Sequence, residues 1–86
     1  MAVHSPAPIN AIPPTGDTIT SYDRAHFVTY LQLLDAHAMR VDWKETARTV
    51  LSIDPDADVE TAERSYDAHL ARASWMTQVG YRQLLK

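Results

Sequence analysis

The chain has 86 residues, a formal net charge of -3 and no cysteine. Such a length allows one small domain with a modest core, and the missing thiols exclude a disulfide framework and a thiolate metal cluster. Because no apolar run reaches the roughly 18 to 20 residues of a membrane span, and no secretory signal opens the chain, we expect a cytoplasmic protein.

Residues 1–20 are predicted to form a disordered tail. Four of the five prolines in the chain lie here, where they remove backbone donors and fix φ. The scattered apolar side chains between them cannot bury enough surface to offset the entropy of ordering the segment. The alternative is that two of them, Ile9 and Ile12, dock onto a partner or onto the domain that follows.

The first helix is expected over about 22–40, inside a domain of residues 21–86. Ser21 or Asp23 can cap this helix. Apolar residues recur in it at steps of three and four, which places them on one face that would turn toward the core. They are Phe27, Tyr30, Leu31, Leu34 and Ala38.

A second, short helix is expected over about 43–51, and a turn follows it. Asp42, with Glu45 three residues later, resembles a capping box. Pro55 disfavours helix at the residue before it, and the aspartates around it can bond their own backbone. We therefore place a seven-residue connection at 52–58.

The third helix, about 59–79, is the longest, and Asp58 is its expected cap. Gly80 is placed to end it in a left-handed conformation, and residues 81–85 then make a final turn or short helix. No segment alternates with a period of two residues, so no sheet is expected. The prediction is an all-α fold, a small helix-turn-helix-like bundle of three main helices plus a short C-terminal helical segment.

No pattern of catalytic residues or metal ligands stands out. The chain has no Gly-rich phosphate loop, no nucleophile elbow and no His-Glu-x-x-His. Asp54, Asp56 and Asp58 alternate as calcium ligands can, but the Gly and the closing Glu of such a loop are missing. The four histidines are scattered without a second ligand at i+3 or i+4 in the same helix. We expect no enzymatic activity, no cofactor and no metal.

The third helix takes the position of the DNA-reading helix of a helix-turn-helix domain. Its expected reading region, residues 52–67, holds six acidic residues against Arg64 alone. Carboxylates repel phosphate and release no counterions, so the charges argue against DNA binding although the helix order favours it. A plain alternative is that the acidic start complements the helix dipole. Five of the other basic residues could contact a DNA backbone but form no single groove-reading stripe: Lys44, Arg48, Arg72, Arg82 and Lys86.

The face of the third helix opposite the core carries a stripe with spacings of four, three and four residues: Arg64, Ala68, Ala71 and Trp75. Small residues allow close approach, and Arg and Trp are enriched at interface hot spots. We predict that this stripe binds a protein partner. An acidic flank would engage a basic surface of that partner: Asp58, Glu60, Glu63 and Asp67. The alternative is that Trp75 packs under the first helix or the tail.

Three segments of the chain are similar to one known family. They are Leu34-Asp35-Ala36, then Trp43-Lys44-Glu45-Thr46-Ala47 through Val50-Leu51, and the ending Gly80-Tyr81-Arg82-Gln83-Leu84-Leu85. The family is the helix-turn-helix-variant domain of bacterial conjugative-element regulators, first catalogued as a domain of unknown function. The resemblance covers about residues 22–86 and leaves the tail unmatched.

The resemblance implies a function and partners. Longer members of the family activate transcription by binding DNA, whereas a short stand-alone member is an antiactivator that silences activators. Glu60, Glu63 and Asp67 depart from a basic reading helix and favour the antiactivator branch, with DNA binding weak or absent. The implied partners are a TraR-like, LuxR-type quorum-sensing activator and an FseA-like activator that carries its own copy of the domain. The implied outcome is repression of transfer of an integrative conjugative element.

Two other functions remain open at this point. One is a DNA-binding transcriptional regulator or excision cofactor of a mobile element, which the helix order favours. The other is a helical adaptor of a different kind, such as a toxin–antitoxin component, which nothing in the sequence separates from an antiactivator.

Overall fold

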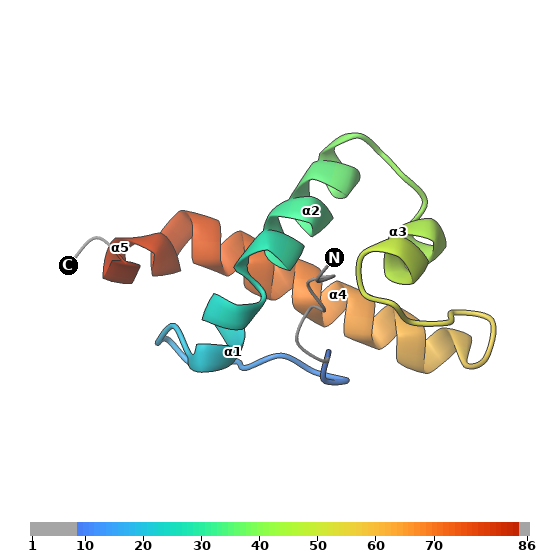
Figure 1. The fold of residues 1–86 in the computed structure, drawn as a ribbon, viewed down its shortest axis with the longest axis horizontal. Coiled ribbons are helices and arrows are strands. Elements are labelled where there is room, and N and C mark those ends of the chain that lie inside the picture. The colour runs from blue at the N-terminus through green and yellow to red at the C-terminus, as the bar shows by residue number, and fades with distance from the viewer. Residues whose placement is uncertain (1–8, 85–86) are drawn as a thin grey trace, which may run out of the picture.

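The computed structural model describes residues 9–84, and every regular element in that range is helical (Figure 1). The prediction of an all-α fold is therefore confirmed. In chain order the elements are α1 (Ser21–Ala25), α2 (Phe27–Ala38), α3 (Trp43–Thr49), α4 (Val59–Trp75), a π-helical turn η1 (Met76–Gly80) and α5 (Tyr81–Leu84). α2 and α3 both pack against α4, which runs along most of the molecule.

The starts of the helices follow from short polar side chains. Asp42 and Asp58 precede α3 and α4, as expected, and accept hydrogen bonds from the amides of Lys44 and Thr61. The cap of α1 is Thr20 rather than Ser21 or Asp23. Its hydroxyl accepts from the amide of Asp23, whose carboxylate accepts from the amide of Thr20, so Asp23 completes a capping box instead.

The predicted first helix is broken at His26, which separates α1 from α2. The amide of His26 donates to two carbonyls, those of Tyr22 and Asp23, and its φ of -110° leaves the helical range. The face of α2 that turns inward also differs from the predicted one, with Tyr30 and Leu33 buried. Phe27 and Leu31, which the apolar spacing placed in the core, are 39% and 44% exposed.

The core lies where α2, α3 and α4 meet, and one residue from the segment before α1 joins it. The buried hydrophobic residues of this core are Ile19, Tyr30, Leu33, Leu51, Tyr66, Ala73 and Met76. Because Ile19 is buried there, the packed domain begins before residue 21. Inside residues 9–84, no helix has both the length and the apolar character needed to cross a membrane.

Gly80 serves close packing rather than a left-handed turn. No described glycine has a positive φ; the residues that do are Arg40 and Ser52, after α2 and α3. A Cβ added to Gly80 would lie 2.7 Å from Cζ3 of Trp75, so the indole ring rests directly on the glycine backbone. The chain continues through η1 into α5 without the predicted stop.

Residues 9–20, part of the tail predicted to be disordered, contain no helix or strand, yet part of them packs onto the domain. Pro13 and Ile19 are buried, and Ile9 packs against the core, whereas Ile12 stays 44% exposed. Ile9 therefore follows the alternative in which it docks onto the domain, and Ile12 does not. We call residues 13–19 the strap. The rest of the predicted tail, residues 1–8, lies outside the described residues.

Candidate protein-binding surface on α4

The predicted stripe on α4 lies against the strap rather than in open solvent. Ala68, Ala71 and Trp75 line one side of a cavity of about 290 Å³. Arg72 lines it as well, and the facing side is formed by the strap: Pro13, Pro14, Thr15 and Asp17. Arg64, the first residue of the stripe, is exposed and does not line the cavity. The structure therefore brings together three of the four stripe residues.

Trp75 is half-buried and has two close neighbours. The guanidinium carbon of Arg72 lies 3.9 Å from the centroid of its ring, which is cation–π geometry. The indole also contacts Gly80. Trp75 also packs against the hydrophobic core, and the strap lies across the cavity from it. A ring fixed in this way loses little rotamer freedom when a partner binds it.

A buried ion pair lies beneath the stripe. Arg72 donates from Nε and Nη2 to the two carboxylate oxygens of Asp23, at 3.0 and 2.7 Å, and both side chains are buried. The hydroxyls of Tyr30 and Thr20 donate to the same carboxylate. Burial alone would raise the pKa of Asp23, but the hydrogen bonds from Arg72, Thr20 and Tyr30 outweigh it and hold that pKa well below its usual range. Asp23 is therefore a buried, ionised partner of Arg72.

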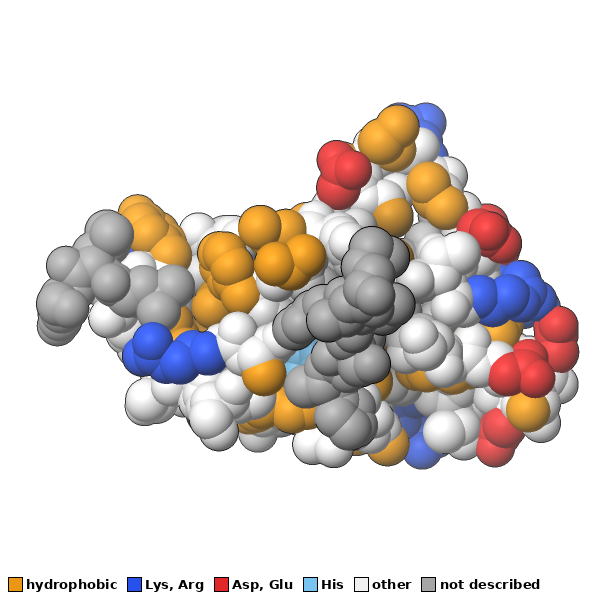
Figure 2. All heavy atoms as spheres, viewed as in Figure 1, with side chains coloured by type: hydrophobic (Ala, Val, Ile, Leu, Met, Phe, Trp, Pro, Cys, Tyr) orange, Lys and Arg blue, Asp and Glu red, His pale blue; other side chains and the backbone are white. Residues whose placement is uncertain are grey.

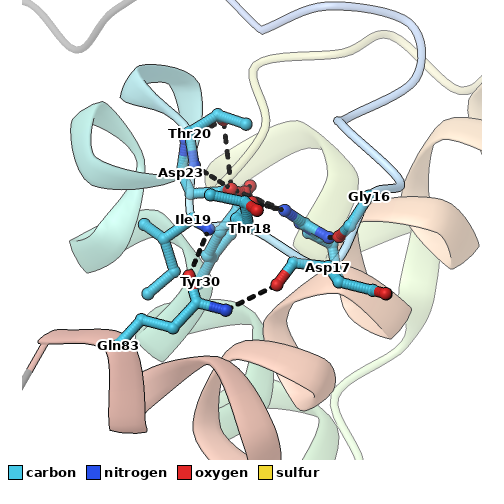
Figure 3. Close-up of polar contacts among 9 residues, drawn as sticks. Gly16, Asp17, Thr18, Ile19, Thr20, Asp23, Tyr30 and Gln83 are labelled. Carbon is cyan, nitrogen blue, oxygen red and sulfur yellow. Dashed lines mark hydrogen bonds and ion pairs between the residues drawn. The ribbon is translucent and has the colours of Figure 1, made fainter.

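The same guanidinium reaches the strap. Arg72 donates from Nη1 to the carbonyl oxygen of Gly16 at 2.6 Å and from Nη2 to that of Thr18 at 2.9 Å. Gln83, in α5, accepts from the amide of Ile19 at 2.9 Å and donates to the carbonyl of Asp17. Figure 3 shows the side chain of Gln83 beside the strap, with dashed lines to Asp17 and Ile19. Two side chains from α4 and α5 thus bind the strap through its backbone.

A second polar chain ties the start of the described segment to α4. The carbonyl of Ser65 lies 2.7 Å from Nδ1 of His69, and a carbonyl can only accept, so Nδ1 carries the proton. Nε2 of this neutral ring then accepts from the hydroxyl of Tyr22 at 2.7 Å, and that hydroxyl accepts from the amide of Asn10. Burial lowers the pKa of His69, in agreement with a neutral ring.

Most of the predicted acidic flank lies at the amino end of α4, apart from the cavity, whereas Asp67 lies at the middle of the helix, next to Ala68. Figure 2 shows acidic side chains gathered where α4 begins. Asp58 caps the helix, and its hydrogen bonds from Thr61 lower its pKa. The rest of the flank is exposed: Glu60, Glu63 and Asp67. The flank therefore occupies the first half of α4, around Arg64, and the cavity lies along the second half.

The aspartates of the α3–α4 connection have local structural roles. Asp54 accepts from the amide of Asp56, and Asp56 pairs with Arg48 at 2.8 Å. Asp58 is the helix cap. Among residues 9–84, no three His, Asp or Glu side chains lie together as a metal site would require.

Sequence reasoning missed the residues that hold the strap. It placed Arg72 among scattered basic residues that could touch a DNA backbone, but Arg72 is buried. Asp23 and Tyr30 are seven residues apart, which is a helical repeat, and this spacing was a usable signal that they share a face. No local pattern links Asp23 to Arg72, or Gln83 to the strap, because these contacts join positions 49 or more residues apart.

Comparison with known proteins adds no relative. No protein-family model matches the chain, and no curated protein matches it significantly. The function is therefore argued from the surface of α4 and from the resemblance of the three segments.

Proposed function

We propose that the protein is a cytoplasmic, non-enzymatic antiactivator that binds transcriptional activators and keeps them from DNA. Its targets would be a LuxR-type quorum-sensing activator and an activator with a related helix-turn-helix-variant domain. The consequence would be repression of transfer of an integrative conjugative element. The resemblance of residues 34–36, 43–51 and 80–85 suggests the partner classes, and α4 supplies the surface.

The charge on α4 is the observation that carries the proposal. Three exposed carboxylates in the helix face solvent, and Arg64 is its one exposed guanidinium. The other, Arg72, is paired with Asp23 in the interior. A helix charged in this way repels phosphate but complements the basic DNA-reading surface of an activator.

The cavity supports the proposal because it gives the surface an apolar anchor. Buried aromatic and arginine side chains near a pocket dominate the energetics of most protein interfaces. Trp75 is oriented by Arg72 and by Gly80, next to the small side chains of Ala68 and Ala71. An acidic end for orientation and an anchor at the other end are the two parts that a specific interface needs.

The test is a competition titration. Fluorescent operator DNA is bound by the LuxR-type activator, and the protein is added while anisotropy is followed. We expect the wild-type protein to displace the DNA. Trp75→Ala should weaken this inhibition by about 30-fold, the factor that corresponds to a hot-spot loss of about 2 kcal/mol. Arg64→Glu should weaken it as well.

The matched control is Val28→Ala, which truncates a side chain that is 64% exposed on α2. It should inhibit as well as the wild type. Unchanged inhibition by both α4 variants, with the fold intact by circular dichroism, would refute α4 as the binding surface. The same DNA titrated with the protein alone at low salt tests the alternative function. Specific binding with a steep salt dependence would identify a DNA-binding regulator instead.

A further inference from the structure

A chain of hydrogen bonds holds residues 9–12, which we call the arm, against α1 and α4. The amide of Asn10 donates to the hydroxyl of Tyr22 at 3.0 Å, and that hydroxyl lies 2.7 Å from Nε2 of His69. Ile9 adds partial packing against the core, whereas residues 10–12 are exposed. A segment with few buried contacts opens locally at a low cost in free energy. The docking of the arm therefore depends strongly on the arrangement of the Tyr22 hydroxyl.

That arrangement requires a neutral His69. Nδ1 of the ring donates to the carbonyl of Ser65 at 2.7 Å, which leaves Nε2 to accept the proton of the Tyr22 hydroxyl. A protonated imidazole is a donor at both nitrogens and cannot accept this proton. The Tyr22 hydroxyl would then face a second donor, and its present arrangement between Asn10 and His69 would be lost.

The charged groups around the ring give a protonated His69 no free counter-ion within residues 9–84. His69 is fully buried, and the one buried carboxylate in that range, Asp23, is engaged by Arg72 of α4 and Tyr30 of α2. A buried charge without a partner is strongly unfavourable, so a protonated ring would be stabilised by reaching water.

His26 adds to this effect from the junction of α1 and α2. Its ring is buried, and the ring centroids of His26 and Tyr22 lie 4.3 Å apart, while those of Tyr22 and His69 lie 6.0 Å apart. Burial lowers the pKa of His69 and outweighs the hydrogen bond to Ser65, and the proximity of His26 lowers it further. The folded chain thus binds the proton less readily than a form in which the ring is exposed.

The strap, by contrast, is held independently of His69. Arg72 and Gln83 bind its backbone, and Ile19 lies in the core. Pro13, directly after the arm, is buried. Opening of the arm can therefore stop at this residue and leave the rest of the domain packed.

We propose that His69 is a pH-sensitive latch for the arm: its protonation breaks the contact with Tyr22 and releases residues 9–12, while the helices and the strap stay packed. The arm is docked where His69 is neutral. It is released as pH falls below the ordinary His pKa of about 6.5, because the open form binds the proton more tightly. Histidines act as pH sensors when their protonation biases an element that has two states. The latch goes beyond the proposed function and does not depend on which partner α4 binds.

A spin label on the arm measures its release. The chain has no cysteine, so Ala11→Cys in the full-length protein carries the label at one exposed site. Electron paramagnetic resonance then gives the ratio of released to docked arm. Between pH 7.5 and pH 5.5 this ratio should rise about tenfold, the factor for one proton that the open form binds with a pKa of about 6.5.

Three variants, each made together with Ala11→Cys, assign the transition. His69→Gln can still accept from the Tyr22 hydroxyl but does not titrate, so the arm should stay docked at both pH values. Tyr22→Phe removes the hydroxyl and should release the arm at both. His37→Gln is the matched control, because His37 is exposed on α2, and it should keep the wild-type transition.

The ring signals of His69 in the wild-type protein give a second test, which needs no stable variant. By NMR, the amide of Asn10 should lose its hydrogen bond at the same pH midpoint at which the ring of His69 titrates. Different midpoints would overturn the proposal, as would release of the arm at low pH in His69→Gln or a docked arm in Tyr22→Phe. Loss of helical circular dichroism at the pH of arm release would show acid unfolding of the whole domain and would also contradict a latch.

These measurements contain no activator, so their failure leaves the proposed function standing. Conversely, the expected transition of the arm combined with no binding of either activator would refute the proposed function and leave the latch in place.

Discussion

Replacing the buried carboxylate with Asp23→Ala is the sharpest test of how the domain is held together. Asp23 is fully buried and accepts hydrogen bonds from Arg72, Tyr30 and Thr20. Its removal leaves the guanidinium of Arg72, 5% exposed, without its counter-ion, and leaves the hydroxyl of Tyr30 without its acceptor. Removing one partner of a buried ion pair lowers the free energy of unfolding by about 3–5 kcal/mol.

That cost is large for a domain of this size. Total stabilities of small domains are about 5–15 kcal/mol, and 1 kcal/mol shifts Tm by roughly 4–8 °C. We expect urea unfolding near neutral pH, followed by circular dichroism, to show a loss of about 3–5 kcal/mol for Asp23→Ala. The double variant Asp23→Ala/Arg72→Met removes both charges. It should recover at least about 1 kcal/mol of that loss, although it also gives up the strap contacts.

Asp56→Ala is the matched control, because its pair with Arg48 is exposed. Its effect on the free energy of unfolding should be far smaller. The reasoning would be refuted if Asp23→Ala cost less than about 1 kcal/mol, since the pair would then behave like a surface ion pair. A double variant less stable than Asp23→Ala would contradict the reasoning as well.

Three further predictions concern packing and pH. Gly80→Ala should lower the free energy of unfolding by about 1–3 kcal/mol, because its Cβ would lie 2.7 Å from the indole of Trp75. Gly16→Ala is the control and should change it by less than about 0.5 kcal/mol, because nothing lies within 4 Å of that Cβ. Urea unfolding of both variants measures the two values. Leu33→Ala should cost about 2–5 kcal/mol and Leu31→Ala clearly less in the same assay, because Leu33 is buried and Leu31 is not; equal losses would contradict the inward face of α2. The free energy of unfolding should fall as pH drops below about 6.5, because folding lowers the pKa of His69 and the unfolded chain then binds one proton more than the folded chain. His69→Gln should make the free energy of unfolding depend less on pH in this range. An unchanged pH dependence in that variant would show that another group causes it.

Local signals in the sequence predict much of the fold. The caps Asp42 and Asp58, the turn around Pro55 and the apolar spacing of the third helix predict α3 and α4 with their starts at the observed residues. Each of these signals lies within a few residues of the structure that it predicts. Capping and turn formation depend on neighbouring backbone groups, so the local sequence is enough.

The inward face of α2 and the docking of the strap depend on distant contacts and were not predictable in this way. Apolar periodicity placed Phe27 and Leu31 inside, but the buried pair of Asp23 and Arg72 turns the side of Tyr30 inward. Composition argued that the tail could not bury enough apolar surface. It did not anticipate the hydrogen bonds of the strap backbone with Gln83 and Arg72, which hold the strap on the domain.

The candidate surface was predicted in part. The four-three-four spacing correctly placed Ala68, Ala71 and Trp75 on one face, which the structure shows lining one cavity. A helical wheel says nothing about what covers a face, so the strap over this stripe was outside its reach. A helical wheel also omits the position along the helix axis, and Arg64 lies outside the cavity because it is nearer the start of α4.

Amide chemical-shift mapping tests the central claim most directly. The isotope-labelled full-length protein is titrated with the unlabelled LuxR-type activator, and then with the activator that carries the related domain. The account predicts that the perturbed amides cluster on the outer face of α4, from Glu60 to Trp75, and in the strap. Perturbations confined to α2 and α3, or an unperturbed spectrum with both activators at saturating concentration, would contradict it.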